Sequence, residues 1–296
     1  MKDSLVDPQV VMRLANTPLA ARQAMLGHMS GRHQSPHRGS SVEFAEYRKY
    51  VPGDDTRRVD WRVYGRSDRF YIKEFEADTN LRLCLVMDTS GSMAFGSGNV
   101  TKWDYAKKLA ATLAHLAIGQ GDAAGLYAGG PKLHCAIPPS RRPTHYMTLN
   151  SALQEMEPVA ETGLTDHLHQ LAEEIPQRAL VVLISDLLDD PDKIIDCWQH
   201  LRFRKHDLAV FQILDPEERT LDFSQPMRFV DLEGEDAIIA EPELIQERYR
   251  AAVARHSAAL QVGVAQCQID FREVSTDEEQ EQVLARFLTQ RLGIQG

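Results

Sequence analysis

Three oxygen-bearing side chains follow a strongly apolar stretch of the chain. The apolar run 83–87 is followed by Asp88, Ser90 and Ser92, so a carboxylate and two hydroxyls stand at alternate positions. In this D-x-S-x-S pattern the three side chains can enter one space, and Gly91 lets the backbone turn tightly there. Carboxylate and hydroxyl oxygens are the hard ligands that Mg²⁺ takes, about six of them at about 2.1 Å. The pattern therefore predicts a site for Mg²⁺ or Mn²⁺.

Two further oxygen-bearing residues are candidates for the same site. Asp186 follows the apolar run 179–185, and Thr165 stands in a Gly-containing loop before a helical pattern. The carboxyl ends of parallel strands meet at one edge of a sheet, so we expect Asp88 and Asp186 to meet there. The alternative is that these residues are helix caps and turn residues. That alternative leaves two carboxylates repelling each other, which a cation would relieve.

The elements that must position these residues alternate between strands and helices. Such alternation implies right-handed crossovers and a mostly parallel sheet covered by helices on both faces. The predicted fold class is therefore α/β, with a doubly wound, mostly parallel sheet. The predicted strands are 81–87, 123–130, 132–139, 179–190, 207–215 and 267–274. The predicted helices are 101–119, 144–156, 165–175, 191–204, 242–261 and one that starts at Asp277.

The first part of the chain has a different composition. Short helical patterns within 1–30 lead to a Gly/Ser/Pro/His-rich loop, and 42–77 is dense in charged and aromatic residues with a strand-like end. We therefore predict a small N-terminal subdomain over 1–80 and an α/β domain over 81–296. The segment 43–76 has two interpretations: an ion-pair network that packs the subdomain onto the sheet, or a docking face rich in Arg and aromatic residues.

Composition excludes several classes of protein. The net charge of the 296 residues is −10, which argues against general binding to nucleic acid or to anionic membranes. The four cysteines are widely spaced without a CxxC pair, which indicates reduced thiols in the cytosol. The N-terminus does not read as a signal peptide, and no apolar stretch reaches the length of a membrane span. We expect a cytoplasmic protein.

The five candidate ligands resemble the metal-ion-dependent adhesion site of the von Willebrand factor A domain. The residues that match are Asp88, Ser90, Ser92, Thr165 and Asp186. The resemblance implies that the three hydroxyls bind the metal, that the two aspartates act directly or through water, and that an acidic side chain of a partner protein fills the last position. It also implies a von Willebrand factor A-like, Rossmann-like fold for 81–296.

A second resemblance covers about residues 25–215 and concerns a bacterial family known as domain of unknown function 58. The residues that carry it are Glu43, Phe44, Tyr47, Arg48, Tyr50, Pro52, Gly53, Asp54, Asp55, Arg57, Asp60, Trp61, Arg66 and Lys73, and the pairs Thr101-Lys102 and Gly121-Asp122 also resemble the family. Genes of this family often stand beside those of MoxR-type AAA+ ATPases. The resemblance implies such an ATPase as the partner, with a role in the assembly or maturation of protein complexes.

Three functions follow from these patterns. The first is a non-enzymatic, metal-dependent protein-interaction module. The second is a hydrolase that uses a metal at Asp88 and Asp186, although an aspartyl-phosphate enzyme needs a carboxylate two residues after its nucleophile and here that residue is Ser90. No G-x-S-x-G elbow and no phosphate-binding G-x-x-x-x-G-K-[ST] loop occurs in the sequence. The third is a structural domain with a vestigial site, against which the full set of five ligands argues.

Overall fold

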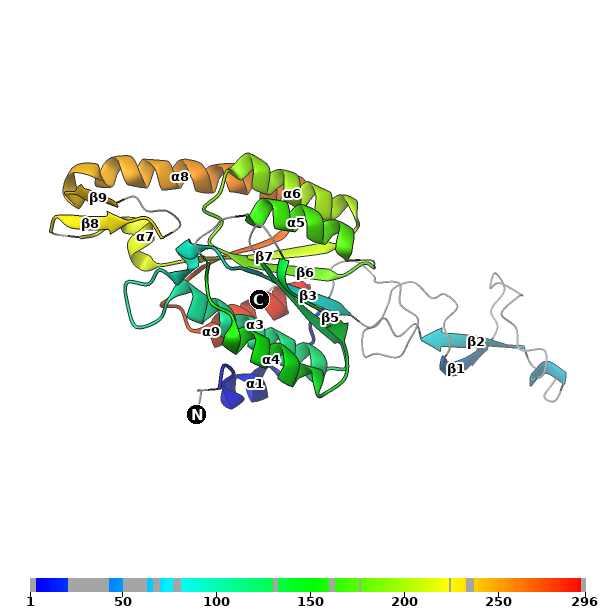
Figure 1. Ribbon diagram of the computed structural model, residues 1–296. Helices are drawn as coiled ribbons and strands as arrows, with labels where there is room; N and C mark the ends of the chain where they lie inside the picture. Colours follow the sequence, from blue (N-terminus) through cyan, green and yellow to red (C-terminus); the bar gives the residue numbers. More distant parts are fainter. Residues whose placement is uncertain are drawn as a thin grey trace.

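A computed structural model gives the fold of the chain. It describes residues 4–20, 43–49, 63–65, 70–76, 81–129, 133–159, 163–175, 177–223, 225–232 and 237–293. A six-stranded sheet forms the centre of the molecule, with helices above and below it (Figure 1). The sheet strands are β3 (Arg82–Asp88), β4 (Ala123–Gly129), β5 (Leu133–Ser140), β6 (Leu180–Ser185), β7 (Asp207–Leu214) and β10 (Asp270–Ser275).

The order of the strands is that of a doubly wound sheet. It runs β10-β7-β6-β3-β4-β5, and all neighbours are parallel except β4 and β5. The first strand, β3, lies between the second, β4, and the fourth, β6, so the chain reverses its direction of winding between β3 and β6. Ligand sites of such sheets form outside the carboxyl ends of the strands at this switch point. The predicted fold class is confirmed.

Helices cover both faces of the sheet and explain why its strands are apolar throughout. Strand β3 sends Leu83, Leu85 and Met87 into one core, whereas Cys84 and Val86 enter the other. The first core lies under α1 (Pro8–Leu14), α3 (Lys102–Gly119), α4 (His145–Glu155) and α9 (Gln280–Arg291). The second core lies under α5 (Leu164–Glu174), α6 (Pro191–Phe203) and α8 (Pro242–Cys267). A strand buried on both faces reads as a continuous apolar run rather than as an alternation.

Three short elements were not predicted. Helix α7 (Pro216–Thr220) follows β7, and β8 (Met227–Val230) pairs antiparallel with β9 (Ala237–Ala240). Ile238 and Ile239 on β9 are both exposed. A strand is recognised in a sequence by apolar residues at alternate positions, which arise when one face is buried. Strand β9 buries neither face, so its sequence does not show this alternation.

The N-terminal part shows one more pair of strands. β1 (Glu43–Lys49) and β2 (Tyr71–Glu76) pair antiparallel in a sheet of their own. Strand β2 matches the strand-like end of the charged segment, whereas β1 was not predicted. Half of the segment 43–76 falls outside the described residues, so its two interpretations and the predicted boundary at residue 80 remain predictions.

Gly125 is required where β5 approaches β4. A Cβ atom at this position would lie 2.7 Å from the Ile137 carbonyl oxygen and 2.7 Å from the Pro139 nitrogen, beside an irregularity in the pairing of the two strands. Because both contacts are backbone atoms, Gly125→Ala is expected to destabilise the fold by about 1–3 kcal/mol in urea unfolding. Gly119→Ala is the control, since a Cβ there meets nothing within 4 Å and the helix should gain up to about 1 kcal/mol. Equal stability of the two variants would contradict this reading of Gly125.

Candidate metal site

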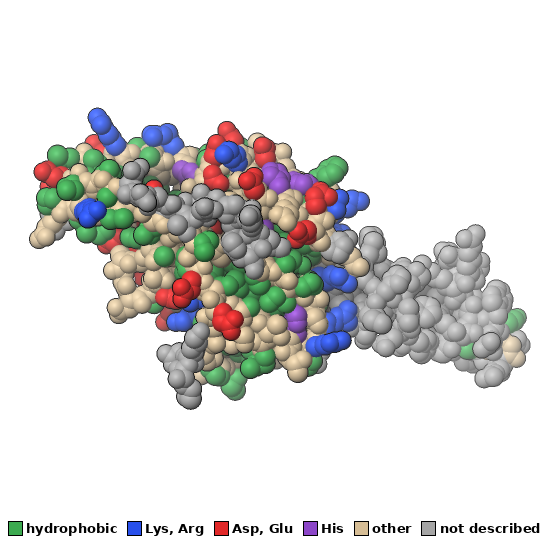
Figure 2. Space-filling model, in the orientation of Figure 1, with side chains coloured by type: hydrophobic (Ala, Val, Ile, Leu, Met, Phe, Trp, Pro, Cys, Tyr) green, Lys and Arg blue, Asp and Glu red, His purple; other side chains and the backbone are tan. Residues whose placement is uncertain are grey.

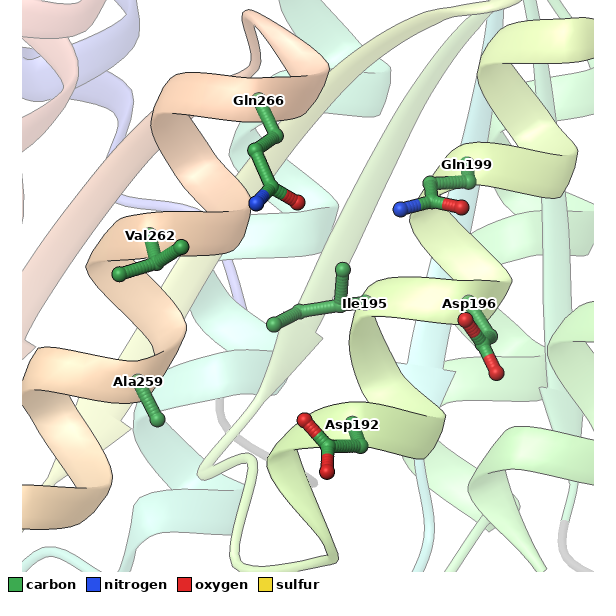
Figure 3. Close-up of a pocket in the computed structure, with 7 residues that line it drawn as sticks. All are labelled: Asp192, Ile195, Asp196, Gln199, Ala259, Val262 and Gln266. Carbon is green, nitrogen blue, oxygen red and sulfur yellow. The ribbon is translucent and has the colours of Figure 1, made fainter.

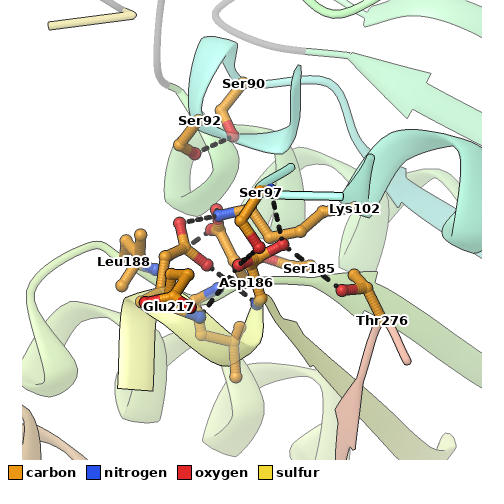
Figure 4. Close-up of polar contacts among 12 residues, drawn as sticks. Ser90, Ser92, Ser97, Lys102, Ser185, Asp186, Leu188, Glu217 and Thr276 are labelled. Atoms are coloured by element: carbon orange, nitrogen blue, oxygen red, sulfur yellow. Dashed lines mark hydrogen bonds and ion pairs between the residues drawn. The ribbon is translucent and has the colours of Figure 1, made fainter. Parts of the chain in front are cut away.

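Four of the five predicted ligands lie at or directly after the carboxyl ends of β3 and β6. Asp88 ends β3 and Asp186 directly follows β6, so the two carboxylates flank the switch point. Both are buried, and the charge of Asp186 acts on Asp88. Ser90 and Ser92 stand on the loop and short 3-10 helix (Gly91–Ala94) after β3, with their Oγ atoms 3.0 Å apart (Figure 4).

Thr165 approaches from another element. It lies in the first turn of α5, half-buried, and its carbonyl oxygen accepts a bond from the Cys197 thiol at 3.3 Å. The loop that leads to α5 is tied to the first loop, because the Val159 N–H donates to the Thr89 carbonyl at 2.7 Å. Within the described part of the chain, no hydrogen bond joins the Thr165 hydroxyl to the other four residues. Its place in the site remains a prediction.

Asp88 is held by two hydrogen bonds. The Ser90 N–H donates to Oδ1 at 2.9 Å, and the Ser185 hydroxyl donates to Oδ2 at 2.6 Å. Burial and, after it, the charge of Asp186 raise the pKa of Asp88 to about 6, against the opposing effect of these bonds. Among the described residues no Lys or Arg forms an ion pair with Asp88. Within the described ranges, the site therefore holds a buried carboxylate that has no cationic side chain as a partner.

Asp186 has a cationic partner that the sequence did not reveal. Lys102, the first residue of α3, is fully buried, and its Nζ lies 2.7 Å from Asp186 Oδ2. The same Nζ lies 2.5 Å from Oε1 of Glu218 on α7. Burial lowers the pKa of Lys102, but the two carboxylates outweigh this effect and leave the pKa above its usual value. Lys102 is therefore a charged group inside the site.

The backbone after β6 is shaped to hold Asp186. Leu187 adopts a left-handed conformation with φ of 57°, which costs a non-glycine residue about 1–2 kcal/mol. The Leu187 N–H donates to the Ser185 hydroxyl at 2.9 Å, and the Leu188 N–H lies 3.3 Å from Asp186 Oδ1. The turn thus fixes both carboxylates at once, since Ser185 in turn donates to Asp88.

Asp215, at the end of β7, organises the neighbouring loop. Its Oδ1 accepts from the Ser97 hydroxyl at 2.6 Å, its Oδ2 accepts from the Ser97 N–H at 2.9 Å, and the Thr276 hydroxyl lies 3.4 Å away (Figure 4). It also caps α7 in a reciprocal capping box with Glu218. Ser97 therefore ties the loop between Ser92 and Lys102 to the carboxyl end of β7, where α7 begins.

The donor set fits a hard divalent cation. It combines two buried carboxylates with hydroxyls and contains no nitrogen or sulfur ligand. The Thr89 hydroxyl, in the same loop, is buried without a hydrogen-bond partner in the described chain. Over the described ranges, no group of three or more His, Cys, Asp or Glu side chains could hold a metal. The candidate site is of another kind, because serine hydroxyls supply part of it.

Comparison with known proteins identifies the family of this chain. Residues 46–259 match the family described as "Protein of unknown function DUF58". The chain belongs to this family. An uncharacterized protein of Mycobacterium tuberculosis, Rv1480, is 26% identical over 299 residues, covering 98% of this chain and 92% of its own. An uncharacterized protein of Mycobacterium bovis, Mb1516, matches equally.

Solved structures similar to this DUF58 chain have low sequence identity. The hypothetical protein BatB from Bacteroides thetaiotaomicron has a TM-score of 0.48 at 12% identity, covering 72% of this chain and all of its own. The vWF domain of the type V pili tip protein Mfa5 from Porphyromonas gingivalis has a TM-score of 0.37 at 13% identity, covering 73% of this chain and 97% of its own.

In the described part of the chain, no helix is both long and apolar enough to cross a membrane.

Two hollows lie beside helix α6. One of them is lined by the predicted ligand Thr165 together with His169, Asp189 and Lys193, between α5 and α6. The other lies between α6 and α8 (Figure 3). Its lining residues are Asp192, Ile195, Asp196, Gln199, Ala259, Val262 and Gln266. Beside this hollow, Gly263 lets α8 approach Ile195 closely, because a Cβ atom at position 263 would lie 2.4 Å from Ile195 Cγ1. The lining of this second hollow thus mixes carboxylates, amides and apolar side chains.

Proposed function

We propose that this DUF58 chain is a metal-dependent protein-interaction module. The observation that carries the proposal is a buried Asp88 that has two hydrogen-bond donors and a carboxylate neighbour but no cationic partner among the described residues. A bound Mg²⁺ or Mn²⁺ would supply that positive charge and one open position for a hard oxygen. Asp88, Ser90, Ser92, Thr165 and Asp186 would hold it, and an acidic side chain of the partner would complete the site.

The partner we propose is a MoxR-type AAA+ ATPase, and the role is the assembly or maturation of protein complexes. The support for this identity is the DUF58 family membership and the gene neighbourhood that the family resemblance implies. The physical support is electrostatic. A carboxylate that approaches a cation in a site shielded from water gains far more than it would in bulk solvent.

A hydrolase is the other candidate, and the residue two positions after Asp88 argues against it. Ser90, two residues on, offers a hydroxyl where an aspartyl-phosphate enzyme needs an acid/base carboxylate. No observation in the described residues favours catalysis over binding.

Metal binding is expected to stabilise the free protein. A ligand that binds only the folded state adds RT ln(1 + [L]/Kd), which is about 2.7 kcal/mol at a hundredfold excess over Kd. Thermal melts with Mg²⁺, Mn²⁺ or EDTA measure this, and Asp88→Ala should lose the shift. A wild-type melting temperature that does not change with millimolar amounts of either metal, together with a flat calorimetric titration, would show that the free protein binds neither metal and would contradict this prediction.

Binding of the partner is expected to require both the metal and Asp88. The test is a pull-down of the purified ATPase encoded beside the gene, with wild type or Asp88→Ala, each in Mg²⁺ or EDTA. Recovery is expected only with wild type in Mg²⁺. Equal recovery in all four conditions would show that association ignores the metal, and the bridging mechanism would then be abandoned.

A further inference from the structure

Lys102 stands in an unusual place for a lysine. It is fully buried and occupies the first turn of α3, where the helix dipole disfavours a positive charge. It stays there because its ammonium group lies between Asp186 and Glu218, at 2.7 Å and 2.5 Å. The ammonium thus contacts directly one of the two carboxylates that the metal would use.

The position of this ammonium group is fixed from both sides. Asp186 Oδ1 faces the Leu188 N–H on a strained turn, while Glu218 Oε2 accepts from the Asp215 N–H within the capping box of α7. Asp215 also holds the loop before Lys102 through Ser97. The ammonium group is held by two carboxylates, and the loop before Lys102 is held by Asp215. The side chain therefore cannot move away from Asp186 without breaking these contacts.

The positive charge of Lys102 has opposite effects on the divalent cation and on the acidic side chain of the partner. A fixed ammonium beside Asp186 repels a divalent cation and cancels part of the attraction that the carboxylates exert. The same ammonium attracts an incoming carboxylate. Lys102 therefore weakens the metal site of the free protein and favours the site that also contains the partner's acidic group.

We propose that Lys102 is a positioning residue that acts as a built-in competitor of the metal, so that the divalent cation is held firmly only when a partner carboxylate arrives with it. The proposal rests on the proposed function of the site. Glu218 tunes the competition, because its charge offsets that of Lys102. The two residues should therefore act on metal affinity in opposite directions, a pattern that loss of structure would not produce.

The experiment is calorimetric titration of the full chain with MnCl₂ in the absence of any partner. Lys102→Met removes the charge and keeps the length of the side chain, so the Kd is expected to fall on the order of tenfold. Glu218→Gln leaves the lysine less compensated, so the Kd is expected to rise by a similar factor of about ten. Glu217→Gln is the matched control, since Glu217 is the neighbouring acid on α7 and binds the Asp222 N–H rather than Lys102. Its Kd should equal that of wild type.

The outcomes separate this inference from the proposed function. Wild type that binds Mn²⁺, with Lys102→Met binding equally or more weakly, would overturn the inference and leave the metal site intact. If Lys102→Met does not fold, Glu218→Gln decides, and an unchanged or lower Kd for that variant would overturn the inference. Binding by Lys102→Met alone would support it, whereas no binding by any variant would overturn both the inference and the metal site.

Discussion

Replacing Asp88 with asparagine is expected to make the free protein more stable at pH 7. The pKa of the buried carboxyl is raised to about 6 by burial and by Asp186, so the folded state binds a proton more tightly than the unfolded chain does. Ionisation therefore costs stability as pH rises from about 4 to about 6, and the cost persists above pH 6. At 1.36 kcal/mol for each pKa unit, Asp88→Asn should gain up to about 3 kcal/mol at pH 7.

Urea unfolding of both proteins between pH 4 and 7 measures this gain. The stability difference between variant and wild type should shrink as pH falls from about 6 to about 4, because Asp88 is then protonated in the folded state and increasingly protonated in the unfolded chain. The same variant should lose the Mg²⁺-dependent shift. Asp190→Asn is the matched control, because Asp190 caps α6 at the surface and asparagine caps equally well. An Asp88→Asn protein that is less stable than wild type at pH 7 would show that the carboxylate is structural.

The sequence predicted the parts of the site that depend on local pattern and on strand order. Apolar runs ending in Asp88 and Asp186 identify the two strands, and alternation with helices places both ends at one edge of a parallel sheet. The predicted strand 179–190 was too long, because the apolar residue Leu187 continues the pattern beyond the true end of β6 at Ser185. Leu187 is buried from a left-handed turn, which hydrophobicity alone does not distinguish from a strand.

The part that could not be predicted depends on pairing over long distances. Lys102 and Glu218 are 116 residues apart and meet only because α3 and α7 both begin at the carboxyl edge of the sheet. A lysine in the first turn of a helix is a weak local sign of such a partner. The D-x-x-E pattern from Asp215 to Glu218 is readable as a capping box, yet nothing in it indicates that Glu218 also faces Lys102.

Removing the buried ammonium group is expected to be the most damaging single change at the site. Lys102→Met leaves Asp186 buried without a cation, and breaking a buried pair on one side costs about 3–5 kcal/mol in the free energy of unfolding. Lys107→Met on the same helix is the control, since Lys107 pairs with the half-exposed Asp104 and surface pairs contribute at most about 1 kcal/mol. Urea unfolding in EDTA compares the two variants.

A double-mutant cycle shows whether the loss comes from the unpaired carboxylate. If it does, adding Asp186→Asn to Lys102→Met should recover most of the lost stability, because only Glu218, which is partly exposed, then remains without the ammonium group. A double variant that is as unstable as Lys102→Met, or less stable, would attribute the loss to packing of the lysine stem instead. Adding Mn²⁺ to the single variant should also restore stability, and by more than it adds to wild type, because the cation replaces the missing charge beside Asp186. A lysine that stabilises the metal-free protein and weakens metal binding only while no partner carboxylate is present would thus account for the burial of Lys102 beside Asp186.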